Sequence, residues 1–139
     1  MPGRSAPYFV DKQCVPLEFD PEETTSSTSF VDIPGAVLTT NDLGEDGFYN
    51  IWFSILVSAS LNNTEIAFRS MVNGVPTSTD GRGINIKTKD LEVGYTLMTC
   101  ATIPAGSTIQ AQWKTDQGTA TLDHLDIIFE GAAVSRVLT

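Results

Sequence analysis

The single histidine, His124, is the residue in this sequence best suited to acid–base or metal chemistry. It stands between carboxylates in the run Asp123-His124-Leu125-Asp126, and an imidazole beside a carboxylate can serve as an oriented base or a metal ligand. No serine or cysteine nucleophile motif accompanies it, and a cupin-like metal site needs several histidines. We interpret His124 and Asp126 as a polar pair on one face of a strand, with Asp123 on the other face. We expect no enzymatic activity, no cofactor and no resident metal.

The two cysteines, Cys14 and Cys100, carry little chemical signal. They form no C-x-x-C pair, so a cysteine zinc site is not expected. A single disulfide between them is one option. Two unpaired thiols are the favoured interpretation, because the first residues contain no apolar stretch typical of a secretory signal.

Carboxylates gather near the N-terminus, in the segment 18–23. Their spacing does not match a calcium-binding loop. The whole chain has 17 acidic and 8 basic residues and a net charge of −9, which argues against binding to a nucleic-acid backbone. A protein surface of basic character would instead suit the acidic segment.

The elements that must position these residues are predicted to be strands. Thr, Val and Ile supply 37 of the 139 residues, and β-branched side chains favour strands. Short runs of period two alternate with turn signals such as Pro34-Gly35 and Asn73-Gly74. The predicted strands cover 26–31, 36–40, 47–60, 64–73, 84–88, 91–103, 108–115 and 120–130. A hairpin expected between the last two indicates antiparallel pairing.

About eight antiparallel strands in one domain fit an all-β, two-sheet jelly-roll sandwich. An immunoglobulin-like sandwich is the alternative, but the Cys…Trp…Cys spacing of that fold is missing. We expect three parts: an extended N-terminal arm at 1–23, the jelly-roll domain at 24–131 and a C-terminal tail at 132–139. The longest apolar run, 51–61, is broken by serines, so no membrane segment is expected.

The segment 47–60 has apolar residues on both of its faces. Its odd positions from Tyr49 to Ala59 are all apolar and should face the core. Its even positions should meet water, yet they include Phe48, Trp52 and Leu56. Such a second apolar face implies that another segment or another subunit covers it. We take these three residues as a candidate subunit interface.

The N-terminal segment combines prolines, large apolar residues and carboxylates. Proline cannot donate to a β ladder, and a purely flexible tail would not need large apolar groups. We interpret 1–23 as an arm that binds a neighbouring subunit; an edge strand on its own domain is the alternative. The candidate partner-binding residues are Tyr8, Phe9, Leu17, Glu18, Phe19 and Asp20.

Four sequence stretches resemble tumour-necrosis-factor-like and complement-like trimeric jelly rolls. They are Gly47-Phe48-Tyr49-Asn50-Ile51-Trp52-Phe53, the hairpin 71–74, the strand entry 103–111 and the closing strand 125–131. Small acidic, Thr-rich domains of this kind are similar to the capsid decoration (cement) proteins and fibre heads of tailed bacteriophages.

The resemblance implies a virion structural protein, made in the host cytoplasm and placed on the capsid surface. It would bind the major capsid protein, bridge coat subunits and form a homo-oligomer, with a trimer favoured and a dimer possible. A receptor- or carbohydrate-binding head or tail-fibre domain is the alternative function. Trp113 or Tyr95 would suit sugar stacking if exposed, but alternation places both on inward faces.

Overall fold

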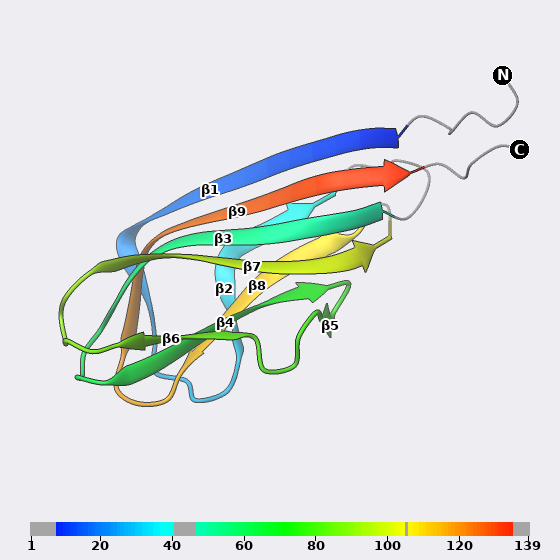
Figure 1. Ribbon diagram of the computed structural model, residues 1–139. Coiled ribbons are helices and arrows are strands. Elements are labelled where there is room, and N and C mark those ends of the chain that lie inside the picture. Colours follow the sequence, from blue (N-terminus) through cyan, green and yellow to red (C-terminus); the bar gives the residue numbers. More distant parts are fainter. Residues whose placement is uncertain (1–7, 41–46, 105, 135–139) are drawn as a thin grey trace, which may run out of the picture.

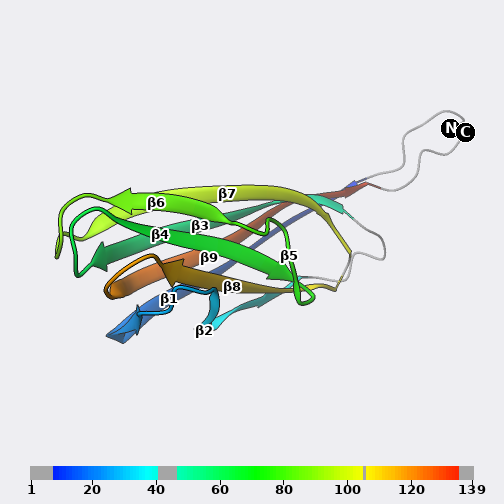
Figure 2. The ribbon, with the colours of Figure 1, turned by 90° about the horizontal axis from the view of Figure 1, so that it is seen from below.

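The structure is a computed structural model that describes residues 8–40, 47–104 and 106–134. Its regular structure is entirely β, arranged in two layers (Figures 1 and 2). The strands are β1 (Tyr8–Thr25), β2 (Val31–Thr39), β3 (Gly47–Ala59), β4 (Thr64–Val72), β5 (Val75–Pro76), β6 (Arg82–Ile86), β7 (Val93–Ile103), β8 (Thr108–Thr115) and β9 (Ala120–Val134). Within the described ranges, no helix is long and apolar enough to cross a membrane.

The strands form two antiparallel sheets. The first sheet has the order β1-β9-β3-β7, and the second has the order β2-β8-β4-β5, with β6 also paired to β4. Figure 1 shows β1, β9, β3 and β7 running side by side above the second sheet. The predicted all-β, antiparallel jelly-roll sandwich is confirmed.

The core lies between the sheets and is built by strict alternation. In β3 every odd position from Tyr49 to Ala59 is buried, while the even positions from Asn50 to Ser58 are half-buried. Strand β8 contributes the largest buried side chain, Trp113, whose ring lies 5.9 Å from that of Phe68 on β4. Period-two patterning therefore predicted the core-facing residues correctly, because successive side chains of a strand point to opposite faces.

Two expectations about strand connections need correction. The predicted strands 26–31 and 36–40 are replaced by the single strand β2, whose register with β8 shifts between Asp32 and Val37, around Pro34-Gly35. The last two strands also do not form a hairpin, because β8 pairs with β2 and β4 while β9 pairs with β1 and β3. The turn at 116–118 thus carries the chain from one sheet to the other.

The N-terminal segment is an edge strand of the domain rather than an arm. Strand β1 pairs with β9 from Tyr8↔Val134 to Thr25↔Ala120, and Leu17 packs against the core cluster. This pairing satisfies backbone groups of β9 that an unpaired edge would leave open. The expected boundary at residue 23 therefore falls inside β1. At the other end β9 extends to Val134, and the rest of the expected tail lies outside the described residues.

Replacing Leu17 with alanine should lower the free energy of unfolding by about 1–3 kcal/mol, because the side chain fills space against the core. Its neighbour Glu18 is exposed, so Glu18→Ala should change stability by less than about 0.5 kcal/mol. Urea unfolding followed by tryptophan fluorescence gives both values. Equal stability of the two variants would contradict the edge strand and favour a free arm.

Candidate functional site

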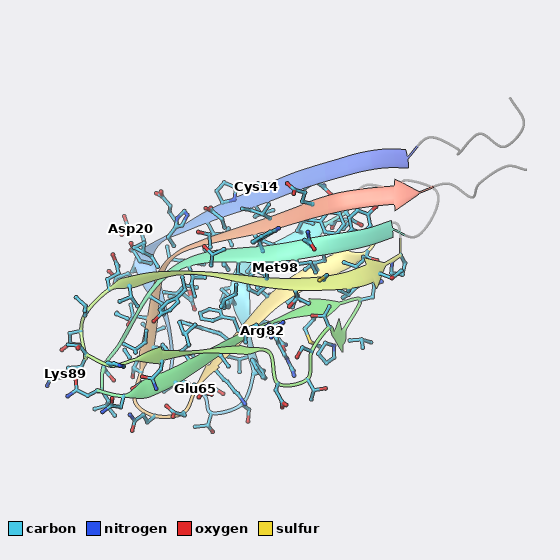
Figure 3. All side chains as sticks on the ribbon, viewed as in Figure 1. Cys14, Asp20, Glu65, Arg82, Lys89 and Met98 are labelled. Atoms are coloured by element: carbon cyan, nitrogen blue, oxygen red, sulfur yellow. The ribbon has the colours of Figure 1, made fainter. Side chains whose placement is uncertain are left out.

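The outer face of the first sheet, which points away from the second sheet, is the candidate interaction surface. A row of four side chains crosses all its strands at one level: Cys14 pairs with Ile128, Ile128 with Trp52, and Trp52 with Met98. We call these four residues the apolar row. Its ends, Cys14 on β1 and Met98 on β7, are labelled in Figure 3.

The apolar row remains accessible to solvent in the described chain. Met98 keeps 38% of its surface exposed, Cys14 is exposed, and Trp52 and Ile128 are half-buried. Leu56 is also half-buried on the same face, whereas the side chain of Phe48 lies outside the described residues. The predicted second apolar face of β3 is thus present at Trp52 and Leu56, and its use as a subunit interface stays a prediction.

Charge divides the outer face into two halves along the strands. Strands β3 and β7 contain no Asp, Glu, Lys, Arg or His at all. Strands β1 and β9 together contain eight carboxylates and one lysine. The carboxylates are Asp11, Glu18, Asp20, Glu22, Glu23, Asp123, Asp126 and Glu130. By register Glu18, Asp126 and Glu130 stand at outward positions, with Lys12 paired to Glu130, whereas Asp11 and Glu23 stand at the levels of the buried Tyr49 and Leu122. We call the two parts the uncharged half, β3 and β7, and the acidic half, β1 and β9.

A hollow opens at one end of the acidic half, where two strand irregularities lie side by side. The register of β1 with β9 shifts between Glu18 and Glu23, and that of β9 with β3 shifts between Leu56 and Val57. The second shift leaves Asp123 as an extra residue, as in a β-bulge. Figure 3 shows Asp20 at the place where β1 bends.

This acidic hollow is open to solvent and has a volume of about 670 Å³. Carboxylates form much of its lining, while Phe19, Pro21 and Leu56 supply apolar surface. Its residues are Glu18, Phe19, Asp20, Pro21, Glu22, Leu56, Asp123 and His124. Among the described side chains no three His, Cys, Asp or Glu residues are placed to hold a metal ion.

Within the hollow, the sequence prediction for the histidine is partly corrected. His124 Nε2 lies 2.9 Å from Asp126 Oδ1, and the two side chains are 28% and 27% exposed, as expected for a pair on one strand face. Asp123, however, lines the same hollow as His124. The bulge is the reason, because one extra residue interrupts the alternation of side chains.

The remaining predicted site residues are distributed differently from the expected arm. Glu18 and Asp20 are exposed and line the hollow, whereas Leu17 and Phe19 pack against the chain's own core. Tyr8 and Phe9 belong to β1, but their side chains lie outside the described residues. Leu17 thus contributes to the chain's own packing, whereas Phe19 packs against the core and also lines the hollow, and their role in binding a partner stays a prediction.

Both cysteines are unpaired and exposed, so no disulfide joins Cys14 to Cys100. The two aromatic residues considered for sugar stacking face inward, as alternation predicted: Trp113 is 1% exposed, and Tyr95 packs against the core cluster. The Tyr95 hydroxyl donates to the carbonyl of Asn85 at 3.3 Å.

Sequence reasoning missed the full extent of the apolar row and of the acidic hollow. The sequence patterns described above connect neither Ile128 nor Met98 with Trp52. Alternation alone could have marked both as outward-facing apolar residues. Their alignment with Trp52 requires the strand order and register, which depend on pairing between distant segments.

No family model matches the chain, and no curated protein matches its sequence. Among solved structures, the chain is similar to a viral capsid protein in the structure of infectious bursal disease virus, Gx strain. The TM-score is 0.57 and the identity 9%, over 97% of this chain and 38% of the viral chain. It is also similar to dimeric latent PorU from Porphyromonas gingivalis, with a TM-score of 0.53 and 9% identity over 94% of this chain and 13% of PorU.

Eiger TNF from S. frugiperda aligns with a TM-score of 0.37 and 11% identity, over 96% of this chain and 98% of that chain. This score carries no further weight. The two higher scores show a shared fold. The chain spans only a minor part of those two proteins, and none of the three is a bacteriophage protein. Kinship with bacteriophage decoration proteins therefore stays a prediction.

Two adjacent residues of β9 should differ strongly in their contribution to the free energy of unfolding. Leu125 is fully buried, so Leu125→Ala should lower the free energy of unfolding by about 2–5 kcal/mol. His124 is partly exposed and makes a solvent-accessible pair with Asp126, so His124→Gln should cost less than about 1 kcal/mol. Chemical denaturation measures both. A large loss with His124→Gln would show that the imidazole is structural rather than part of a surface site.

Proposed function

We propose that this protein is a virion structural protein of the capsid-decoration kind, which binds the outside of a capsid and stabilises it by bridging coat subunits. In this proposal its partner is the major capsid protein, its place is the virion surface, and it performs no catalytic step. The observation that carries the proposal is the outer face of the first sheet, where an apolar row and an acidic hollow lie on one exposed surface.

Exposed apolar residues in a continuous row support an interaction role. Isolated surface leucines or methionines are ordinary, but contiguous apolar surface bordered by polar groups is typical of binding sites. The apolar row meets this description, because it crosses every strand of the first sheet. Burying a side chain such as Trp52 on a partner contributes about 1.5–3 kcal/mol before the costs of association are counted.

The acidic hollow supports a coat partner of basic character. Its carboxylates come from two strands and line the hollow together with the apolar side chains of Phe19, Pro21 and Leu56. A lysine or arginine side chain matches such a lining, since its aliphatic stem packs on apolar surface while its charged end meets carboxylates. A basic segment of a coat subunit would therefore bind here, and repetition over a shell would add avidity.

The test is the occupancy of capsids from the virus that encodes the chain, first stripped of this protein and then incubated with it. Glu18→Gln combined with Glu22→Gln removes two exposed carboxylates of the hollow. At about 0.2–1 kcal/mol for each exposed ion pair, binding should weaken by about two- to thirty-fold. Added salt should weaken wild-type binding as well. Co-sedimentation and an electron-microscopy map of the decorated shell measure the effect.

The matched control is Asp80→Asn combined with Glu92→Gln, which changes the net charge equally at exposed positions outside the hollow. This control should bind like the wild type. Capsids that carry no density for the chain would overturn the proposal. Equal weakening by both double variants would overturn the hollow as the contact.

A further inference from the structure

We propose that two copies of this chain associate face to face through the outer face of the first sheet. The two-fold axis runs parallel to the strands, so the acidic half of each copy lies over the uncharged half of the other. The inference concerns the chain on its own and stands whether or not a coat protein is its partner.

The apolar row gives this pairing a self-complementary centre. An axis parallel to the strands keeps each residue at its own level along them. Ile128 of one copy then lies over the partner's Trp52, and Cys14 lies over the partner's Met98. Every member of the row meets an apolar or sulfur-bearing side chain, with no ionised group in the row.

The available area is that of an ordinary protein interface. Four strands spaced about 4.8 Å apart, each contributing about ten residues at about 3.4 Å, give a face of roughly 650 Å². Two such faces bury on the order of 1,300 Å², within the ~1,200–2,000 Å² of standard interfaces. The four-stranded sheet is therefore large enough to hold a second copy without help from other surfaces.

The charge division selects one orientation of the second copy. If the axis ran across the strands through the apolar row, β9 would lie over the partner's β9, and Asp126 would face the partner's Glu130, which costs free energy. With the axis along the strands, Asp126 faces the partner's Ser54, and the acidic half lies over the uncharged half, two strands without charged residues. Asn50, Ser54 and Thr96 on that half can donate hydrogen bonds to carboxylates.

The same geometry places both acidic hollows at one end of the pair. The hollow includes Glu18, His124 and Leu56, which pair with one another across the sheet, and Leu56 lies four residues along β3 from Trp52. Because the axis preserves levels, the hollow of the partner lies at that same end. In the pair each hollow therefore lies against the partner at the level of its Leu56 and Gly94, so a basic segment would bind the hollow of the unpaired chain.

Introducing a positive or a negative charge on the uncharged half tests the orientation of the two copies. Thr96 is exposed on the outer face of β7 and would lie opposite the partner's acidic half. Thr96→Lys should therefore tighten dimerisation, and Thr96→Glu should weaken it, with a difference of at least about ten-fold in Kd. Thr88 is exposed and outside the first sheet, so Thr88→Lys and Thr88→Glu should leave the Kd unchanged. Sedimentation equilibrium of each purified chain gives these constants.

Loss of the central aromatic group provides a second measurement. Trp52→Ala should weaken the dimer by about thirty-fold or more, as expected for a buried aromatic at the centre of an interface. Val75, which is 65% exposed on β5, provides the control Val75→Ala, which should not affect association. Circular dichroism of each variant verifies that it is folded.

Thiol cross-linking reports on the arrangement directly. Within one chain, three strand spacings, roughly 14 Å, separate β1 from β7, so a shorter bismaleimide cannot join Cys14 to Cys100. In the proposed pair, Cys14 lies over the partner's β7, two residues along from Cys100. Cross-linked dimers should form and should disappear in both Cys14→Ser and Cys100→Ser.

Three results would overturn the inference. They are a wild-type chain that stays monomeric at high micromolar concentration, a trimer in sedimentation, and a Thr96→Lys variant that associates no more tightly than Thr96→Glu. Cross-links that persist in one cysteine variant would indicate that like strands face each other, which would also overturn it. A failure to bind capsids would leave all these outcomes unchanged, so the two proposals fail separately.

Discussion

Strand β3 is the constraint on which the rest of this structure depends. Its odd positions from Tyr49 to Ala59 are all buried, which fixes one face against the second sheet, and it pairs with β9 on one side and β7 on the other. A slip of one residue would turn all of those side chains out of the core. With the register fixed in this way, the outward positions of three strands fall into line, and Trp52 meets Ile128 and Met98 at one level.

The same register explains why the acidic hollow exists. Strand β9 pairs with β3 along one edge and with β1 along the other. The irregularities at Asp123 and between Glu18 and Glu23 occur at the same level of these strands. Bulges bend a sheet and redirect side chains. Here they turn Asp123 onto the side of His124 and bring carboxylates of two strands around Leu56. Regular alternation would distribute these carboxylates over both faces of the strands, whereas the two irregularities place them in one hollow.

The two surfaces suit different contacts. The apolar row is central on the sheet, largely apolar and flanked by an uncharged half, which fits a second copy of the chain. The hollow lies at one end and carries carboxylates around a small apolar lining, which fits a basic segment of another protein. Both surfaces lie on one face of the first sheet, so pairing through this face and binding of a basic segment at the hollow would compete.

The sequence by itself determined the all-β class, most strand positions and the residues that face the core, because alternation is a local property of a strand. It also marked Trp52 and Leu56 as surplus apolar groups and 18–23 as an acidic cluster. Tertiary structure decided that 8–25 is an edge strand rather than an arm, and that β8 and β9 belong to different sheets. It also joined the cluster at 18–23 to Asp123 and His124, about a hundred residues away. These features depend on pairing between distant segments, which satisfies backbone hydrogen bonds and buries apolar faces over the whole chain.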